Sequence, residues 1–186
     1  EKIAPFPNRI VVSHCGDSKI KDSMSVMQFL YDVRKKYGKK ASIDDLPLKI
    51  WNEYFRVNGH GSTIFKISGY IEYPSVAGTY TIDTAKQTIE LSPKMGEYGA
   101  SYSGVTKVAH AIMNSGIIYE NLSIANAISL TRNCLLENID VYKYHAEQSI
   151  GGVCQTYVID AIHDDIGWYQ TDGTLKSDVK APFSLN

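Results

Sequence analysis

The alternation of apolar and polar residues marks the middle of the chain as a group of β-strands. Three segments rich in β-branched and aromatic residues, separated by short turn-forming stretches, are predicted as strands over residues 63–73, 79–83 and 87–91. The alternation is clearest in the last two, so one sheet face is expected against helices and the other toward water. Because the connections are short, we expect an antiparallel meander, and Gly69 is expected to mark a bulge.

A further strand is predicted over residues 8–15, which are apolar and β-branched in their centre. His14 and Cys15 are adjacent in this strand, so their side chains are expected on opposite faces and cannot cooperate directly. The first seven residues, which include two prolines, are expected to be an extended lead-in. A last strand is predicted over residues 168–171.

Apolar residues at helical spacing predict helices on either side of these strands. About five helical segments are expected, over residues 22–38, 42–57, 104–114, 123–138 and 153–163. The expected buried side of the second helix consists of Leu48, Trp51, Tyr54 and Phe55. Helices, then strands, then helices along the chain favour a single α+β domain over residues 1–186. The predicted architecture is a mainly antiparallel sheet of four or five strands packed by about five helices.

The composition is ordinary for a globular protein and narrows the classes of function. Hydrophobic residues make up 44% of the chain and charged residues 21%, and the net charge is −1. Such a charge gives no electrostatic basis for binding nucleic acid or an anionic membrane. No apolar run reaches the length of about 18 residues that spans a bilayer, so no transmembrane segment is predicted. The basic run from Arg34 to Lys40 is interpreted as a solvated helix end.

Motifs for cofactors and metals are missing from the sequence. The glycines match no phosphate-binding loop, and no GxSxG motif is present. His163-Asp164-Asp165 contains possible metal ligands, but no further ligands follow at the spacing of a metal site. We therefore predict neither a cofactor nor a bound metal.

The start of the chain and its cysteines favour a processed, secreted protein with an extracellular location. The chain begins with Glu1 instead of methionine, which fits a removed leader or a shortened chain. Its three cysteines fit one disulfide and one free thiol. A Cys134–Cys154 bridge would close a loop of about 20 residues and add roughly 3 kcal/mol of stability. The rival pairing is Cys15–Cys154, and the sequence does not choose between them.

Asn121-Leu122-Ser123 has the form of a glycosylation sequon, which matters only for a protein that passes through a eukaryotic secretory pathway. Ser123 also stands where the helix over residues 123–138 needs its N-cap. We favour the N-cap interpretation.

Cys154 is the residue with the strongest case for chemical reactivity. Two glycines precede it and an apolar run follows, so a helix over 153–163 would place its thiol beside unpaired N–H groups and the positive end of the helix dipole. The run from Gly151 to His163 resembles the nucleophile helix of papain-like and transglutaminase-like cysteine hydrolases. That resemblance implies a histidine supplied from elsewhere in the fold, and the candidate bases are His14 and His60.

The longest unpatterned stretch, residues 92–103, is the expected binding loop. It combines glycine, serine and tyrosine, a composition typical of adaptable contact loops. Tyr98 and Tyr102 are its candidate binding residues.

Two hypotheses of function follow from these observations. In the first, the chain is a processed, secreted protein of toxin or effector type, without enzymatic activity, that acts by binding a protein or cell-surface partner. Small secreted toxins and effectors, including fungal killer-type toxins, are similar in format. In the second, the chain is a hydrolase or acyltransferase with Cys154 as its nucleophile.

Overall fold

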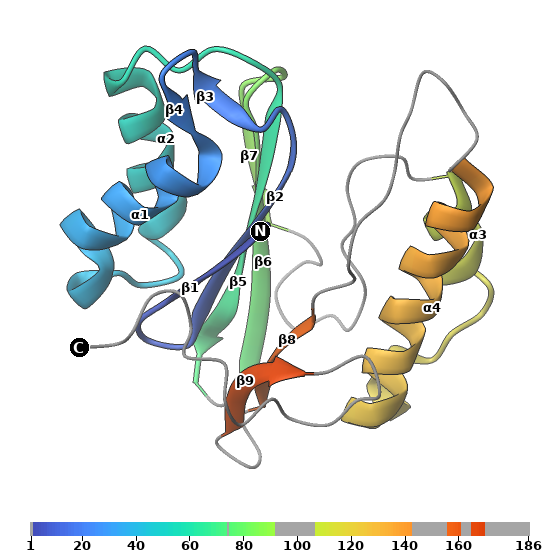
Figure 1. Cartoon of the computed structure of the whole chain (residues 1–186). Helices are drawn as coiled ribbons and strands as arrows, with labels where there is room; N and C mark the ends of the chain where they lie inside the picture. The colour runs from blue at the N-terminus through green and yellow to red at the C-terminus, as the bar shows by residue number, and fades with distance from the viewer. Residues whose placement is uncertain (1, 74, 92–106, 143–155, 161–164, 170–186) are drawn as a thin grey trace. The chain divides into compact units, whose positions relative to one another are not determined.

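The computed structural model describes residues 2–73, 75–91, 107–142, 156–160 and 165–169 (Figure 1). Contacts within the chain separate it into two compact units. The described residues up to Leu91 belong to the first unit, and the helices of residues 107–142 belong to the second. Each unit has a hydrophobic core of its own, and a single domain over residues 1–186 stays a prediction.

The first unit is built on an antiparallel sheet with the strand order β1-β2-β5-β6-β7. The strands are Ile3–Phe6 (β1), Ile10–Gly16 (β2), Thr63–Glu72 (β5), Val76–Asp83 (β6) and Thr88–Leu91 (β7). Since β5, β6 and β7 pair in sequence order, the predicted antiparallel meander is confirmed. β2 pairs with the other side of β5, and β1 forms the edge beyond β2.

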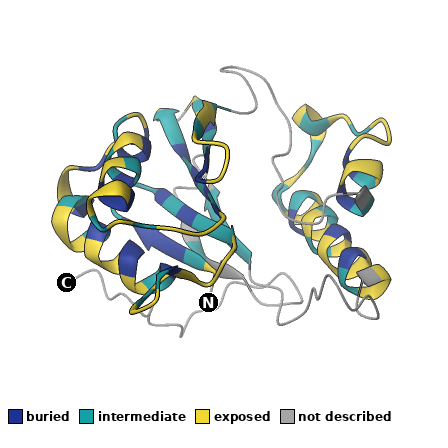
Figure 2. Ribbon diagram, turned by 90° about the horizontal axis from the view of Figure 1, so that it is seen from above, coloured by how far each residue is buried: buried dark blue, intermediate teal, exposed yellow. Residues whose placement is uncertain are grey.

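Two α-helices and a small two-stranded sheet complete this unit. The elements are Lys19–Lys21 (β3), Met24–Ser25 (β4), Val26–Tyr37 (α1), the 3-10 turn Gly38–Lys40 and Leu46–Arg56 (α2). Both helices lie on the same face of the five-stranded sheet (Figure 1). Figure 2 shows that buried residues are concentrated between these helices and the sheet.

Strict alternation along β5 explains why this sheet face becomes the core. Thr63, Phe65 and Ile67 are buried, while the residues between them are half-buried and face the other way. The ring of Phe29 on α1 has its centroid 5.9 Å from that of Phe65 and 6.5 Å from that of Tyr54 on α2. These three rings join both helices to the sheet, and their burial is a large part of the hydrophobic stabilisation.

α1 begins later than predicted, because the residues before it form the β3–β4 pair. Ser25 is its N-cap, and the Ser25 Oγ accepts a hydrogen bond of 3.1 Å from the N–H of Gln28. The cations Arg34, Lys35 and Lys36 lie in the last turn, where the negative end of the helix dipole stabilises them.

The second unit contains two helices that pack against each other, α3 (Lys107–Met113) and α4 (Ile124–Tyr142). A 3-10 turn at Tyr119–Asn121 lies between them in sequence. Among the described residues of this unit, Ala109, Met113 and Cys134 form a buried hydrophobic cluster.

Ser123 caps α4. Its Oγ accepts a hydrogen bond of 3.2 Å from the N–H of Asn126, and its carbonyl accepts one of 2.9 Å from the N–H of Ala127. The N-cap interpretation of Ser123 is therefore confirmed.

The prediction of a helix over residues 153–163 is wrong, because the centre of this segment forms a strand. Thr156–Asp160 (β8) pairs with Asp165–Tyr169 (β9) in a separate two-stranded sheet. Its central residues Tyr157, Val158 and Ile159 are aromatic or β-branched, and this preference for extended backbone outweighs their helical spacing. β9 also shows that the predicted last strand is real but begins before residue 168.

The extended lead-in is part of the sheet, whereas the bulge expected at Gly69 is wrong. The lead-in forms β1, an edge strand, where Pro5 is tolerated because an edge needs only one hydrogen-bonding side. Gly69 pairs regularly with Gly78, and the register shift lies farther along β5, after Tyr70. A Cβ at Gly69 would lie 3.0 Å from the carbonyl oxygen of Arg9, so close packing explains this glycine.

The predicted α+β class is confirmed. Within the residues described, the structure has four α-helices where about five were predicted, and the missing one is the segment replaced by β8. None of the helices in this part of the chain is both long enough and apolar enough to cross a membrane.

Candidate functional site

Three of the predicted site residues, Cys154, Tyr98 and Tyr102, lie outside the residues that the structure describes. Their roles therefore stay predictions. One argument for Cys154 is removed, because residues 156–160 form β8 and supply no helix dipole to stabilise its thiolate.

Cys134 is buried in the core of the second unit. The Nδ2 of Asn138 donates a hydrogen bond of 2.8 Å to the Cys134 carbonyl and lies 3.8 Å from its Sγ. Burial raises the pKa of Cys134, which disfavours the reactive thiolate. No disulfide occurs among the described residues, and Cys154 lies outside them, so a Cys134–Cys154 bridge stays a prediction.

His14 and Cys15 lie on opposite faces of the sheet, as predicted. The register of β2 and β5 places His14 beside Phe65, which is fully buried under the helices, and places Cys15 beside Ile64 on the other face. His14 therefore belongs to the face that packs against α1 and α2.

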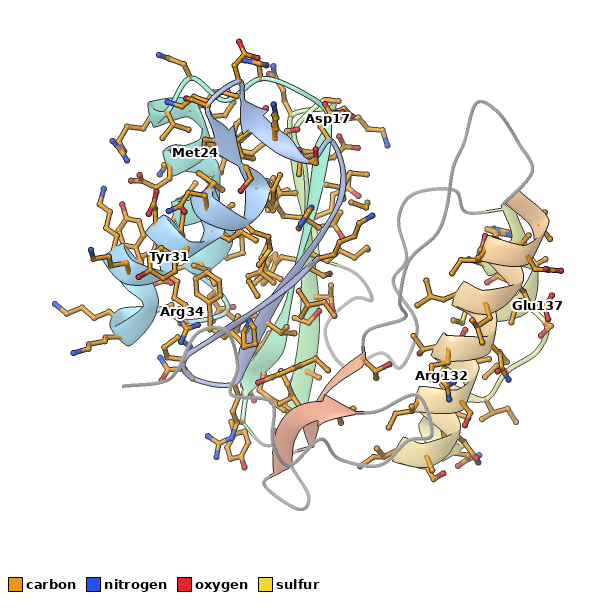
Figure 3. The ribbon with its side chains drawn as sticks, in the orientation of Figure 1. Asp17, Met24, Tyr31, Arg34, Arg132 and Glu137 are labelled. Carbon is orange, nitrogen blue, oxygen red and sulfur yellow. The ribbon has the colours of Figure 1, made fainter. Side chains whose placement is uncertain are left out.

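His60 lies in the exposed loop between α2 and β5. Its backbone N–H donates a hydrogen bond of 2.9 Å to the carbonyl of Ile20. Asp17, labelled in Figure 3, fixes the end of the same loop because its Oδ2 accepts a hydrogen bond of 2.7 Å from the N–H of Ser62. His60 is thus an exposed side chain on an anchored loop, and its role as a base for Cys154 stays a prediction.

α2 has apolar side chains on two opposite sides, and only one side is used by the core. The inner side consists of the buried residues Leu46, Ile50 and Tyr54. On the outer side Leu48 is 56% exposed and Phe55 is 46% exposed, so the prediction that both are buried is wrong. Large apolar side chains exposed together on a helix are typical of a contact surface.

Trp51 joins these two residues into one surface. Positions 48, 51 and 55 are spaced three and four residues apart, so they follow one another along the same side of the helix. The Trp51 ring is half-buried and packs edge-on against Phe55, with 4.9 Å between the ring centroids. Leu48, Trp51 and Phe55 are called the α2 surface below.

A charged flank borders the α2 surface. Lys49 and Arg56 directly follow Leu48 and Phe55, which places them about 100° around the helix from these residues. Lys36 of α1 reaches the same flank, since its Nζ lies 2.7 Å from Oε1 of Glu53.

Glu53 is the buried anion that binds this flank together. It accepts hydrogen bonds of 2.7 Å from Lys36, 2.7 Å from the Tyr37 hydroxyl and 2.6 Å from Arg56. Burial raises the pKa of Glu53, but these hydrogen bonds outweigh burial and lower the pKa to about 2. Glu53 therefore stays ionised near neutral pH.

A small open pocket of about 70 Å³ lies at this flank between α1 and α2. Its lining combines apolar and charged side chains, namely Met24, Phe29, Val33 and Val57 with Asp32, Lys36, Glu53 and Arg56. Lys36 and Arg56 are thus matched by Glu53 and Asp32, and Lys49 is paired with Asp45, so the flank presents both signs of charge beside the apolar α2 surface.

The alternation of residues along β5 contains a signal of a polar sheet face that the sequence interpretation missed. Lys66 and Ser68 occupy every second position between the buried Phe65, Ile67 and Gly69, which places a cation and a hydroxyl on the second sheet face. The exposed α2 surface carries no such signal, because its residues have the composition of a core.

Within the described residues, no group of three or more His, Cys, Asp or Glu side chains is arranged to hold a metal ion. The chain matches no protein-family model, and no curated protein is significantly similar to it.

Proposed function

We propose that the protein acts by binding another protein, and that the α2 surface makes the contact. The observation that carries this proposal is the exposure of Leu48 (56%) and Phe55 (46%) on a helix whose other side already fills the core. Exposed aromatic and aliphatic side chains grouped on one element mark sites where a partner excludes water. A partner that covers these residues removes their apolar surface from water, and this burial favours binding.

The chemistry of the flank defines the partner further. At the border of the α2 surface, Lys36 and Arg56 pair with Glu53, and Lys49 pairs with Asp45. A partner with an apolar centre and a margin that carries charges of both signs matches this arrangement, because opposite charges at a rim steer association. We therefore expect the affinity to fall moderately as the salt concentration rises.

The first experiment places a photo-crosslinking amino acid at position 55 in the full chain and exposes it to extracts or surfaces from the source cells. The matched control is Tyr73, an aromatic residue directly after β5 that is also 46% exposed. We expect a discrete crosslinked protein from position 55 and none from position 73.

Binding of the purified crosslinked protein then tests the surface directly by calorimetry. Phe55→Ser and Leu48→Ser are each expected to weaken the Kd by about tenfold or more, as for central residues of an interface. Tyr73→Ser is expected to leave the Kd unchanged. Equal binding by all three variants, or equal crosslinking from both positions, contradicts the proposal.

We also propose that this binding takes place outside the cell. Asn121, the acceptor position of the sequon, is exposed, which is compatible with a glycan at that position. The test is alkylation of the native protein with iodoacetamide before and after reduction, followed by peptide mapping. An oxidised Cys154 supports a secreted protein, whereas three reduced cysteines contradict it. Rapid labelling of Cys154 alone would instead support the thiol-dependent hydrolase.

A further inference from the structure

The pocket between α1 and α2 combines apolar side chains with charged groups of both signs. Phe29 and Val33 of α1 line it and are buried. Met24, labelled in Figure 3, and Val57 supply the remaining apolar lining. The charged groups are Asp32 and Lys36 of α1 with Glu53 and Arg56 of α2. Two carboxylates and two cations leave the lining without net charge, so it favours a ligand whose own charges cancel.

Asp32 is a carboxylate without a paired cation among the described residues. Lys36 lies four residues farther along α1, at the spacing of a helical ion pair, but its Nζ lies 2.7 Å from Oε1 of Glu53 instead. The Asp32 Oδ1 accepts a hydrogen bond of 3.0 Å from the Nε2 of Gln28, which is a neutral amide. Since Asp32 is exposed, a small cationic group can reach its carboxylate from solution.

Arg56 uses only part of its guanidinium group within the protein. Its Nε donates a hydrogen bond of 2.6 Å to Oε2 of Glu53, and no described residue accepts one from its terminal nitrogens. A guanidinium has five N–H donors, two of which can bind one carboxylate in parallel. The Arg56 side chain is 63% exposed, so these donors can bind the carboxylate of a ligand.

The volume of the pocket limits the size of the ligand. The pocket measures about 70 Å³, whereas an apolar cavity that holds benzene measures about 150 Å³. A group of a few heavy atoms therefore fits between the helices, and a benzene ring does not.

We infer that this pocket binds a small neutral amino acid in its zwitterionic form, such as alanine or glycine. The ammonium group of the ligand pairs with Asp32, and its carboxylate accepts hydrogen bonds from the terminal nitrogens of Arg56. Its short side chain contacts Val33 and Val57, while Glu53 holds Arg56 in place through Nε. The α2 surface does not line the pocket, so the inference is independent of the protein-binding proposal.

The test titrates the isotope-labelled full chain with L-alanine at pH 7 and follows the backbone amide signals by NMR. We expect saturable shifts confined to the pocket and a Kd in the millimolar range, because so small a ligand makes few contacts. Propionate lacks the ammonium group and ethylamine lacks the carboxylate, so each is expected to bind at least about fivefold more weakly than alanine. Phenylalanine is expected to bind no more tightly than alanine.

Two conservative variants assign the charged groups. Asp32→Asn keeps the shape but removes the charge, so it is expected to weaken alanine binding about fivefold and to leave propionate binding unchanged. Arg56→Lys keeps a cation for Glu53 but lacks the planar fork, so it is expected to weaken the binding of both ligands. Lys35→Gln, at an exposed cation outside the lining, is the matched control and is expected to bind alanine normally.

The inference is wrong if alanine causes no saturable shifts, or if the shifts lie outside the pocket. Equal affinities for alanine, propionate and ethylamine, or full alanine binding by Asp32→Asn, would also contradict it.

Discussion

At the scale of single residues, Glu53 determines how the two helices of the first unit meet. Its side chain is 7% exposed and binds Lys36 and Tyr37 of α1 together with Arg56 of its own helix. The cations are half-exposed or more, so water weakens each ion pair, but the carboxylate itself is buried and depends on them. Glu53 thus joins α1 to α2 and also holds the cations at the flank of the α2 surface.

Removal of the charge at Glu53 is expected to destabilise the first unit. Glu53→Gln keeps the shape and one hydrogen-bond acceptor but loses the charge-assisted bonds, at a cost of about 1–2 kcal/mol. Urea unfolding measures this free energy, with the exposed Asp32→Asn as the matched control. An unchanged free energy of unfolding in Glu53→Gln would show that the network contributes nothing to stability.

Lys66 shows, also at the scale of single residues, how much of a side chain's surroundings the sequence can predict. Its position in the alternation of β5 could be predicted from the sequence, since period two places Lys66 and Ser68 opposite Phe65 and Ile67. Its neighbours could not, because Ser13 and Thr81 come from strands whose register only the folded sheet defines.

At the scale of elements, α2 shows why a helical pattern does not identify the buried side. Leu46, Ile50 and Tyr54 form one apolar side, and Leu48 and Phe55 belong to another. Both sides have helical spacing, so periodicity alone supports either choice. The sheet resolves the ambiguity, because it packs against only one side of the helix.

The two sides of α2 are expected to differ in their contribution to stability. Leu48→Ser and Phe55→Ser each change the free energy of unfolding by no more than about 0.5 kcal/mol, because these side chains remain in contact with water. Ile50→Ala, the matched core variant, costs about 2–5 kcal/mol through lost burial and a cavity. Thermal or urea unfolding distinguishes them, and a large cost at Leu48 would mean that the α2 surface is part of the core.

At the scale of the whole molecule, several carboxylates make stability depend on acid pH. Burial raises the pKa of Asp45, but hydrogen bonds from Lys49 and Ser42 outweigh burial and lower the pKa. Burial likewise raises the pKa of Asp83, and hydrogen bonds from Lys86 and Ala85 outweigh it and lower the pKa. The pKa of Glu53 falls from 4.5 to about 2. Each of these groups has a lower pKa in the folded state than in the unfolded state. Its charge therefore stabilises the fold above the unfolded-state pKa, and this stabilisation is lost as the pH falls toward the folded-state pKa.

The free energy of unfolding is therefore expected to be constant above about pH 5 and to decrease as the pH falls from 4.5 toward 2. The Glu53 contribution to this loss is about 2 kcal/mol after allowance for the exposure of Lys36 and Arg56. Urea unfolding measured from pH 7 to pH 2 checks the curve. Glu53→Gln is expected to flatten it, and an identical pH dependence in the variant would contradict this assignment.

The α+β class, the meander of β5, β6 and β7, and the N-cap at Ser123 follow from the sequence alone, because period-two alternation, short turns and capping chemistry are local properties. The segment Thr156–Asp160 does not, since helical spacing and β-propensity compete there and pairing with β9 selects the strand. The exposure of Leu48 and Phe55 and the hydroxyl setting of Lys66 also depend on which surfaces meet. Contacts between residues distant in the sequence have no local signature, so only the tertiary structure decides them.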